Sequence, residues 1–310
     1  MKKLISIIIV ATVILAGCSK KDSTLDVVLD YTPNTNHIGL YVANKLGYYK
    51  EQDVDVNIIQ STQVSAETLV SSKKADIGYS YQENISMARD KNLDVTSIYA
   101  IFNNNSSGFL SHSDKNITRP KDFENKNYCG WGSDVESAIV KQVAKNDGAD
   151  PSSITIKNIS TGFLNTSKEE CDFFWEFEGW NTTKVKLAGV EYNYIPITDY
   201  NLDFYTPVLF TNSKTDKILL QKFITATNKG YQYAIDNPKD AAQILVDEVP
   251  ELEYELVYQS LITISPNINK SGYQSDSVWN IFSQWLIDNK IVSDEFNYKD
   301  AYNNDLIKGE

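Results

Sequence analysis

The chain has 310 residues, with 29 basic and 41 acidic side chains and a formal net charge of −12 at pH 7. This acidic balance argues against a nucleic-acid partner, and three cysteines are too few for a disulfide framework. Only Arg89 and Arg119 are arginines, although arginine is the preferred clamp for carboxylate, sulfonate and phosphate groups. A strongly anionic ligand is therefore disfavoured.

The N-terminus has the layout of a secretory signal peptide. Two lysines precede an apolar run over residues 4–16, which is too short to span a bilayer comfortably. The run ends in LAGC, a small-residue cleavage site closed by Cys18 that resembles the lipobox of bacterial lipoproteins. This predicts a signal peptide over 1–17, lipid on Cys18 and a polar tether over 18–24. The alternative is an ordinary secreted protein whose first cysteine is accidental.

Strand-like and helix-like segments alternate beyond the tether. The first series comprises strands at 25–30, 54–60, 75–80 and 94–102, with helices starting near Ile38 and spanning 64–73 and 83–91. The second comprises strands at 127–132, 154–160, 172–179 and 192–198, with a helix at 134–146. Four helices follow, at 214–236, 239–248, 251–263 and 276–289. This alternation predicts largely parallel α/β sheets covered on both faces.

Two such series predict two lobes. Extended segments at 106–111 and 205–212 are the natural crossovers between them, so the first lobe is discontinuous. We predict residues 25–110 plus 205–310 for this lobe and 111–204 for the other. A chain of this length can support two cores, and a cleft between lobes is a usual place for a small-molecule site.

The sequence contains few residues and motifs that are typical of enzyme active sites. The chain has two histidines and none of the common metalloprotease, hydrolase, P-loop or dinucleotide motifs. The segment "GWGSDVESA" (130–138) could suggest a phosphate loop, but we favour a capping box in which Ser133 and Glu136 satisfy the first backbone N–H groups of a helix. Trp131, in contrast, lies at a strand-to-helix turn, where ligands of α/β proteins bind. No catalytic residue, metal ligand or cofactor is predicted.

Two cysteines remain if Cys18 carries lipid. Cys129 and Cys171 could form one disulfide bond or stay as two buried thiols, and the second is the plainer interpretation.

A family resemblance appears in "LDYTPNTNHIGLYVANKLGYYKEQDVDVNII" (29–59). This segment resembles the N-terminal signature of substrate-binding lipoproteins of ABC importers, in the superfamily shared with fungal thiamine-pyrimidine synthases (NMT1/THI5-like and SsuA-like). The pattern is Asp-aromatic-x-Pro-Asn-x-x-His, Gly-Leu-Tyr-x-Ala, then Gly-Tyr-aromatic-Lys-Glu. One departure is Gln52-Asp53, where Glu-Gly is usual. The resemblance continues in "GYSYQENISMARDKNLDV" (78–95), "RPKDFENKNYCGWGS" (119–133), "FFWEFEGW" (173–180) and residues 223–245.

The resemblance implies a type II periplasmic-binding-protein fold that closes over a ligand and delivers it to an ABC permease. The Gly-Trp-Gly turn and the Trp-x-x-x-Gly-Trp run look most like the branch that binds pyrimidine precursors of thiamine, such as formylaminopyrimidine or hydroxymethylpyrimidine. It further implies a non-enzymatic monomer outside the cytoplasm, anchored by lipid to the outer face of the bacterial cell membrane. The alternatives are a flavin-like heterocycle or small organic ion as ligand, an extracytoplasmic sensor, and a pyrimidine synthase. The synthases rely on a cysteine-rich iron-binding segment that this sequence lacks.

A flat aminopyrimidine suits aromatic rings for stacking and carboxylates for its amino group. The candidate ligand-binding residues lie at the ends of predicted strands and in the adjoining loops. They are Asp30, Tyr31, Asn34, His37, Tyr81, Glu83, Trp131, Trp175, Glu178, Trp180 and Tyr205. His37 could instead bond a neighbouring loop, and Glu83 could cap its helix.

The stretch "CDFFWEFEGW" (171–180) divides by strand alternation. Phe173, Trp175 and Phe177 share one face, and Phe174, Glu176 and Glu178 share the other. The phenylalanines are expected in the core. Trp175 and Trp180 are expected to stack on the ligand or to close over it, and one of the two glutamates to bond it.

Overall fold

The structure is a computed structural model that describes residues 24–60 and 63–307. The predicted signal peptide and Cys18 lie outside these residues. Within them, no helix combines the length and the apolar character that crossing a membrane requires.

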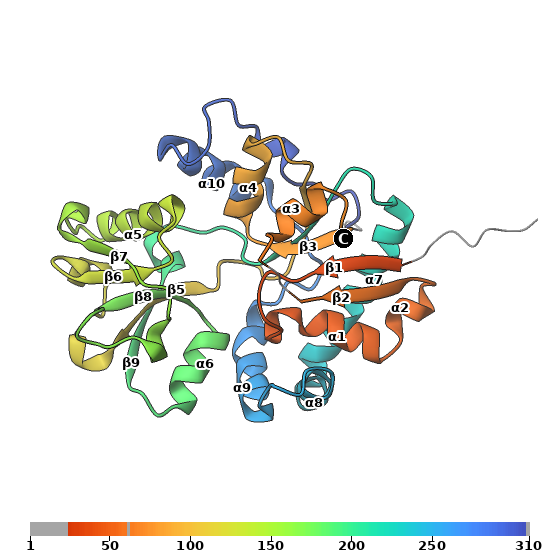
Figure 1. Ribbon diagram of the computed structural model, residues 1–310, viewed down its shortest axis with the longest axis horizontal. Helices are drawn as coiled ribbons and strands as arrows, with labels where there is room; N and C mark the ends of the chain where they lie inside the picture. The colour runs from red at the N-terminus through yellow and green to blue at the C-terminus, as the bar shows by residue number, and fades with distance from the viewer. Residues whose placement is uncertain (1–23, 61–62, 308–310) are drawn as a thin grey trace, which may run out of the picture.

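The chain forms two α/β lobes that lie side by side (Figure 1). In the first lobe, five strands pair in the order β2-β1-β3-β10-β4. They are β1 (Thr24–Val28), β2 (Asp55–Ile59), β3 (Ile77–Ser80), β4 (Thr96–Ala100) and β10 (Val208–Thr211). Its N-terminal helices are α1 (Ile38–Lys45), α2 (Tyr48–Glu51), α3 (Ala66–Ser71) and α4 (Gln82–Asp90). After β10 follow α7 (Lys217–Asp236), α8 (Pro238–Glu248) and α9 (Tyr254–Ile264).

The second lobe repeats this plan with strand order β7-β6-β8-β5-β9. Its strands are β5 (Ser107–His112), β6 (Asn127–Gly130), β7 (Thr155–Asn158), β8 (Phe173–Phe177) and β9 (Tyr192–Pro196). Its helices are α5 (Asp134–Asn146) and α6 (Trp180–Leu187). The predicted two-lobed α/β fold is confirmed. The division into residues 25–110 with 205–310 and residues 111–204 stays a prediction. Because β5 begins at Ser107 and belongs to the second sheet, a division by strands places the first boundary before Ser107.

The strands that follow the two crossovers run against their neighbours. β10 is antiparallel to both β3 and β4, and β5 is antiparallel to both β8 and β9. The remaining pairs are parallel, so both sheets are mixed and the prediction of largely parallel sheets is wrong for the strands that the structure describes. A strand that enters a sheet directly from the other lobe has no crossover helix to return it to the starting edge, so it need not be parallel.

Alternation along the strands gives each sheet two covered faces. In β1, Val27 packs in one hydrophobic cluster and Val28 in another on the opposite face. In β8, Phe173 and Trp175 share a cluster, while Phe174 belongs to a different one. The predicted alternation of the FFWEF strand is therefore confirmed.

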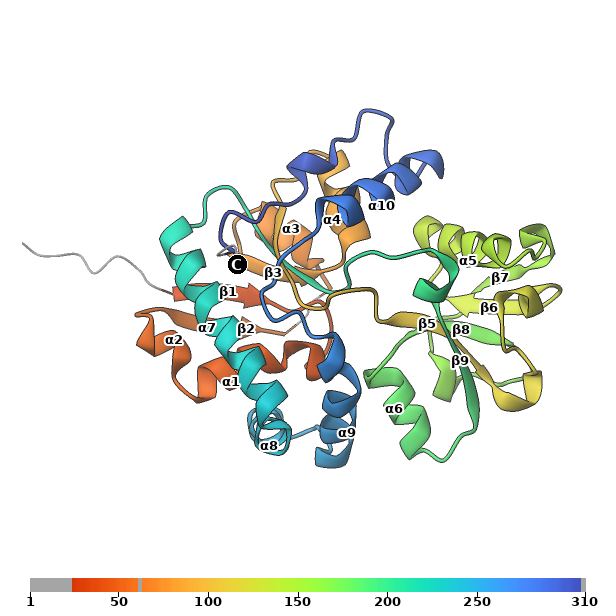
Figure 2. The same ribbon diagram turned by 180° about the vertical axis from the view of Figure 1, so that it is seen from behind.

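Two helical contacts join the lobes in addition to the crossovers. Helix α10 (Asp276–Asp288) begins with Trp279 in a cluster of the first lobe and continues with Phe282 and Leu286 in a cluster of the second. Figures 1 and 2 show α6 of the second lobe beside α9 of the first. A Cβ placed on Gly179, just before α6, would collide with Ile264 of α9, so the absence of a side chain permits this approach.

Cys129 and Cys171 form a disulfide bond. The favoured interpretation of two buried thiols is therefore wrong. Cys129 lies in β6 and Cys171 just precedes β8, and these two strands are parallel neighbours. Strand pairing brings the two Cα atoms to 5.8 Å, within the range for a disulfide.

Removing both sulfurs with Cys129→Ala and Cys171→Ala is expected to lower the free energy of unfolding by about 3 kcal/mol, because the bond closes a long loop in the unfolded chain. The separation of the cysteines is 42 residues. Urea denaturation of the double variant and of wild type measures the difference. A midpoint and slope equal to those of wild type would show that the bond does not form or does not stabilise the fold.

Candidate functional site

Four aromatic rings form a continuous row across the lobe interface. Tyr81 follows β3 in the first lobe and stacks on Phe177 at the end of β8 in the second, with ring centroids 5.7 Å apart. Phe177 stacks in turn on Trp175 at 6.2 Å, and Trp175 on Trp131 at 5.2 Å. We call these four residues the aromatic row. It brings three of the predicted site residues together and adds Phe177.

The spacing within the aromatic row limits where a flat ligand can stack. A ring inserted between two others needs centroids about 7 Å apart, twice the contact distance of carbon atoms, and every spacing in the row is shorter. A ligand ring must therefore stack on an outer face of the row or enter as the lobes separate at Tyr81 and Phe177. Trp131 is 45% exposed and offers such an outer face.

A hydrogen-bonded network holds Asp30 against Tyr81, the first residue of the aromatic row. One oxygen of Asp30 lies 2.7 Å from Nε2 of His37, and the Tyr81 hydroxyl donates to the other at 2.5 Å. Nδ1 of His37 accepts from the backbone N–H of Asn34, at 3.2 Å. We therefore assign the neutral tautomer in which Nε2–H donates to Asp30. Burial opposes ionisation of Asp30, but the hydrogen bonds from His37 and Tyr81 hold its pKa below the ordinary value.

His37 and Asn34 lie behind this network rather than on an open surface. His37 is completely buried and Asn34 is nearly so. Asn34 caps the short helical turn of residues 35–37 through its side chain. Of the two interpretations considered for His37, the structure shows its hydrogen bonds to the neighbouring loop. Through its Nε2 atom, His37 orients the carboxylate of Asp30.

The two glutamates of the FFWEFEG stretch differ in their surroundings. Glu176 is buried, accepts hydrogen bonds from the Phe163 backbone N–H and the Asn181 side chain, and has its pKa raised by burial. Glu178 is exposed at the end of the strand, where its backbone N–H donates to the Ser106 carbonyl in the crossover. Because Glu176 already has protein partners, Glu178 has the freer carboxylate.

The remaining candidates divide between buried and exposed places. Trp180 is buried and packs within the cluster of the first lobe although it belongs to α6 of the second. Tyr205 is buried in the second crossover, where its hydroxyl accepts from the Ser275 N–H and its backbone pairs with Gln82. Tyr31 is 55% exposed after β1.

Three residues of the candidate site carry buried polar atoms without a hydrogen-bond partner. Among the described residues, these atoms are Oε2 of Glu83 and the indole nitrogens of Trp175 and Trp180. Burial, with a smaller contribution from Glu67, raises the pKa of Glu83 to about 8. Most buried polar atoms in proteins find a partner, so each of these three atoms is an exception whose missing partner a bound ligand would be able to supply.

The turn that carries Trp131 is tightly fixed by Glu136. The carboxylate of Glu136 accepts from the Tyr128 hydroxyl at 2.5 Å and from the backbone N–H groups of residues 131, 132 and 133. Ser133 accepts from the N–H of Glu136, which confirms the predicted capping box. A side chain on Gly130 would occupy the place of this carboxylate.

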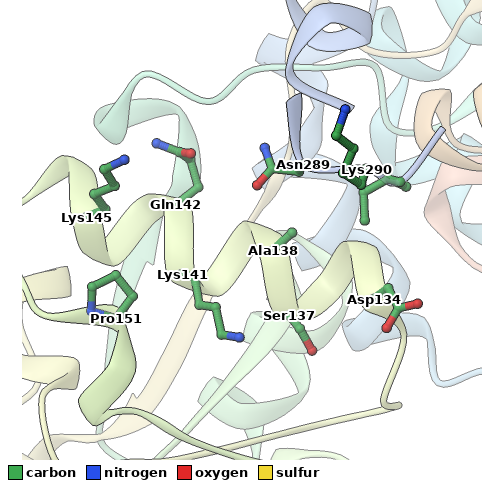
Figure 3. Close-up of a pocket in the computed structure, with 10 residues that line it drawn as sticks. Asp134, Ser137, Ala138, Lys141, Gln142, Lys145, Pro151, Asn289 and Lys290 are labelled. Atoms are coloured by element: carbon green, nitrogen blue, oxygen red, sulfur yellow. The ribbon is translucent and has the colours of Figure 1, made fainter. Parts of the chain in front are cut away.

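Surface hollows lie away from the aromatic row. One of about 590 Å³ lies between α5 and the segment that follows α10, where Lys141, Lys145 and Lys290 are among its lining residues (Figure 3). A smaller one of about 250 Å³ lies between α6 and α9. Neither is lined by a candidate ligand-binding residue. We place the candidate site at the aromatic row, because its stacked rings join the two lobes and the indole nitrogen of Trp175 has no partner there.

Sequence reasoning assigned Phe177 to the strand core, and the structure places it at the lobe interface. The available signal was its register: Phe177 shares a face with Trp175 and lies nearest the carboxyl end of β8. The contact between Gly179 and Ile264 has no local sequence signal, since these residues are far apart in the chain.

Solved structures share this architecture. The periplasmic aliphatic sulphonate binding protein SsuA from Escherichia coli superposes with a TM-score of 0.71 at 10% identity, over 93% of this chain and 94% of that one. The architecture is that of the type II periplasmic-binding proteins. The family model described as NMT1/THI5 like matches residues 34–241, and the chain belongs to this family.

Two curated relatives match nearly the full length. One, from Halalkalibacterium halodurans, is named formylaminopyrimidine-binding protein and is 24% identical over 92% of each chain. The other, from Legionella pneumophila, is named 4-amino-5-hydroxymethyl-2-methylpyrimidine phosphate synthase and is 24% identical over 93% of this chain and 94% of its own. The relatives thus include a binding protein and a synthase.

Proposed function

We propose that this protein is an extracytoplasmic solute-binding protein of an ABC importer and binds a pyrimidine precursor of thiamine, of the formylaminopyrimidine or hydroxymethylpyrimidine type. The carrying observation is the aromatic row at the lobe interface, with unpaired buried polar atoms on Glu83, Trp175 and Trp180. The name of the Halalkalibacterium relative supports this ligand class.

The energetics of such a site are consistent with useful affinity. Each ring stacked on a base-like heterocycle contributes about 1–3 kcal/mol, and a hydrogen bond to a charged carboxylate about 1.5–3 kcal/mol. Micromolar to nanomolar binding requires roughly 8–12 kcal/mol. Two stacking contacts, one carboxylate and burial of the ring reach this range after the cost of association.

We assign roles to the candidates as follows. Tyr81 and Trp131 would supply stacking surface at the two ends of the aromatic row, with Phe177 added where the lobes separate, and Trp175 would support them from within the row. Glu83 and Glu178 would bond polar edges of the ligand, and Asp30 would act together with His37 and Asn34. Trp180, Tyr31 and Tyr205 would complete or close the site.

We propose further that Cys18 carries a lipid that anchors the monomer to the outer face of the cell membrane, where it would deliver its ligand to a permease. The lipobox-like LAGC sequence supports the anchor. A second candidate function is pyrimidine synthesis, which the name of the Legionella relative favours. Stoichiometric iron in the purified protein, or product formation, would support this alternative.

A thermal-shift panel tests the proposal. Ligand at 100 times its Kd stabilises the folded state by about 2.7 kcal/mol, which raises the Tm of a protein of this size by roughly 5 °C. We expect this response to hydroxymethylpyrimidine or formylaminopyrimidine, and no response to an alkanesulfonate, since arginine is nearly absent. A shift with a flavin or an alkanesulfonate, and none with either pyrimidine, would contradict the proposed ligand class.

A further inference from the structure

Two unpaired hydrogen-bonding groups lie next to the contact between the lobes, one on each side. Glu83 is two residues from Tyr81 at the start of α4, is 7% exposed, and has no partner for Oε2. Trp175 is 4% exposed, stacks on Phe177, and has no partner for its indole N–H. Tyr81 stacks on Phe177 and Phe177 on Trp175, so one group follows the first-lobe partner of the contact in sequence and the other stacks on its second-lobe partner.

The chemistry of the two groups differs. The carboxyl of Glu83 lies among acidic neighbours: Glu67 and Asp30 both act electrostatically on the adjacent Tyr81. In the described part of the chain, none of these three carboxyls is in an ion pair with lysine or arginine. A protonated carboxyl has one O–H donor and one carbonyl acceptor. The indole of Trp175 is a donor only.

An aminopyrimidine matches this arrangement. Its amino group and the adjacent ring nitrogen form a donor–acceptor edge that pairs with a carboxylic acid through two hydrogen bonds. Its 5-substituent, a hydroxymethyl or formylaminomethyl group, carries an oxygen that can accept from an indole N–H. Glu67 is less suited to the first role because it already accepts a hydrogen bond from Ser80.

We propose that Glu83 is the specificity-determining residue that binds the amino edge of the pyrimidine from the first lobe, while the Trp175 N–H binds the oxygen of its 5-substituent from the second. The ligand then bridges the lobes in one orientation. This inference rests on the proposed function and goes beyond it by assigning each edge of the ligand to one residue. It also gives a reason why two polar atoms remain buried without partners.

The test measures affinity for matched pyrimidines by titration calorimetry on the full chain. Wild type should bind 4-amino-5-hydroxymethyl-2-methylpyrimidine at least tenfold more tightly than its analogue without the amino group, because the lost partner leaves Glu83 unpaired. Glu83→Gln retains one donor and one acceptor and should keep most of this ratio. Glu83→Met should reduce the ratio to below threefold. The control Glu67→Gln makes the same change of charge nearby and should keep the wild-type ratio.

The second lobe is tested with the analogue that carries a 5-methyl group in place of 5-hydroxymethyl. Trp175→Phe keeps an aromatic ring but removes the N–H. The ratio of its affinities for the 5-hydroxymethyl and 5-methyl compounds should therefore be about fivefold lower than that of wild type. If Glu83→Met still binds the amino compound tenfold more tightly than the analogue without the amino group, the assignment of Glu83 is wrong. If Trp175→Phe prefers the hydroxymethyl compound over the 5-methyl analogue as strongly as wild type does, the assignment of Trp175 is wrong. If wild type binds neither pyrimidine, the proposed function itself fails.

Discussion

Replacing Trp175 by alanine is expected to abolish measurable pyrimidine binding and to lower the free energy of unfolding by about 3–5 kcal/mol. The side chain is 4% exposed and packs in the main cluster of the second lobe, so its removal leaves a large cavity. It also lies between Phe177 and Trp131, so its loss interrupts the aromatic row. Chemical denaturation and calorimetric titration measure the two effects separately.

Trp131→Ala is the matched control for this prediction. Trp131 lies beside Trp175 in the row but is 45% exposed, so its loss should weaken binding by about 10- to 100-fold through lost stacking. Its free energy of unfolding should stay within about 1 kcal/mol of wild type. Wild-type affinity in Trp131→Ala would mean that the ligand does not use the exposed end of the row.

Replacing Glu136 by alanine is expected to lower the free energy of unfolding by about 3–5 kcal/mol and to weaken ligand binding as well. The change removes the acceptor of four hydrogen bonds, including that of the buried Tyr128 hydroxyl. Each bond to a charged group contributes about 1.5–3 kcal/mol, and water recovers part of the loss at the exposed turn. Urea denaturation measures the stability and titration the affinity.

The conservative variants separate the roles of this carboxylate. Ser133→Ala removes only the cap that accepts from the Glu136 N–H, so it should cost about 1 kcal/mol and leave affinity nearly unchanged. Glu136→Gln keeps an acceptor and should fall between the two. Equal stability of Glu136→Ala and Ser133→Ala would contradict the importance assigned to the bonds around Trp131.

Much of the fold could be predicted because its signals are local. The alternation of Phe173, Phe174 and Trp175 predicted a strand with two covered faces, and the structure places these side chains in separate clusters. Ser133 and Glu136 predicted a helix start by their spacing alone. Candidate ligand residues followed from the rule that ligands of α/β folds bind at strand ends, and their roles stay predictions.

The features that could not be predicted depend on contacts between distant segments. The bond between Cys129 and Cys171 requires knowledge that β6 and β8 are neighbours. The place of Phe177 depends on its approach to Tyr81 of the other lobe. Trp180 packs into the cluster of the first lobe from a helix of the second, which no periodicity within α6 encodes.

Isothermal titration of the full chain with 4-amino-5-hydroxymethyl-2-methylpyrimidine and with formylaminopyrimidine tests the central claim most directly. The account predicts one site per chain and a Kd in the micromolar to nanomolar range, roughly −8 to −12 kcal/mol, for at least one of the two. Absence of binding to both at millimolar concentration, with a folded protein, would contradict it.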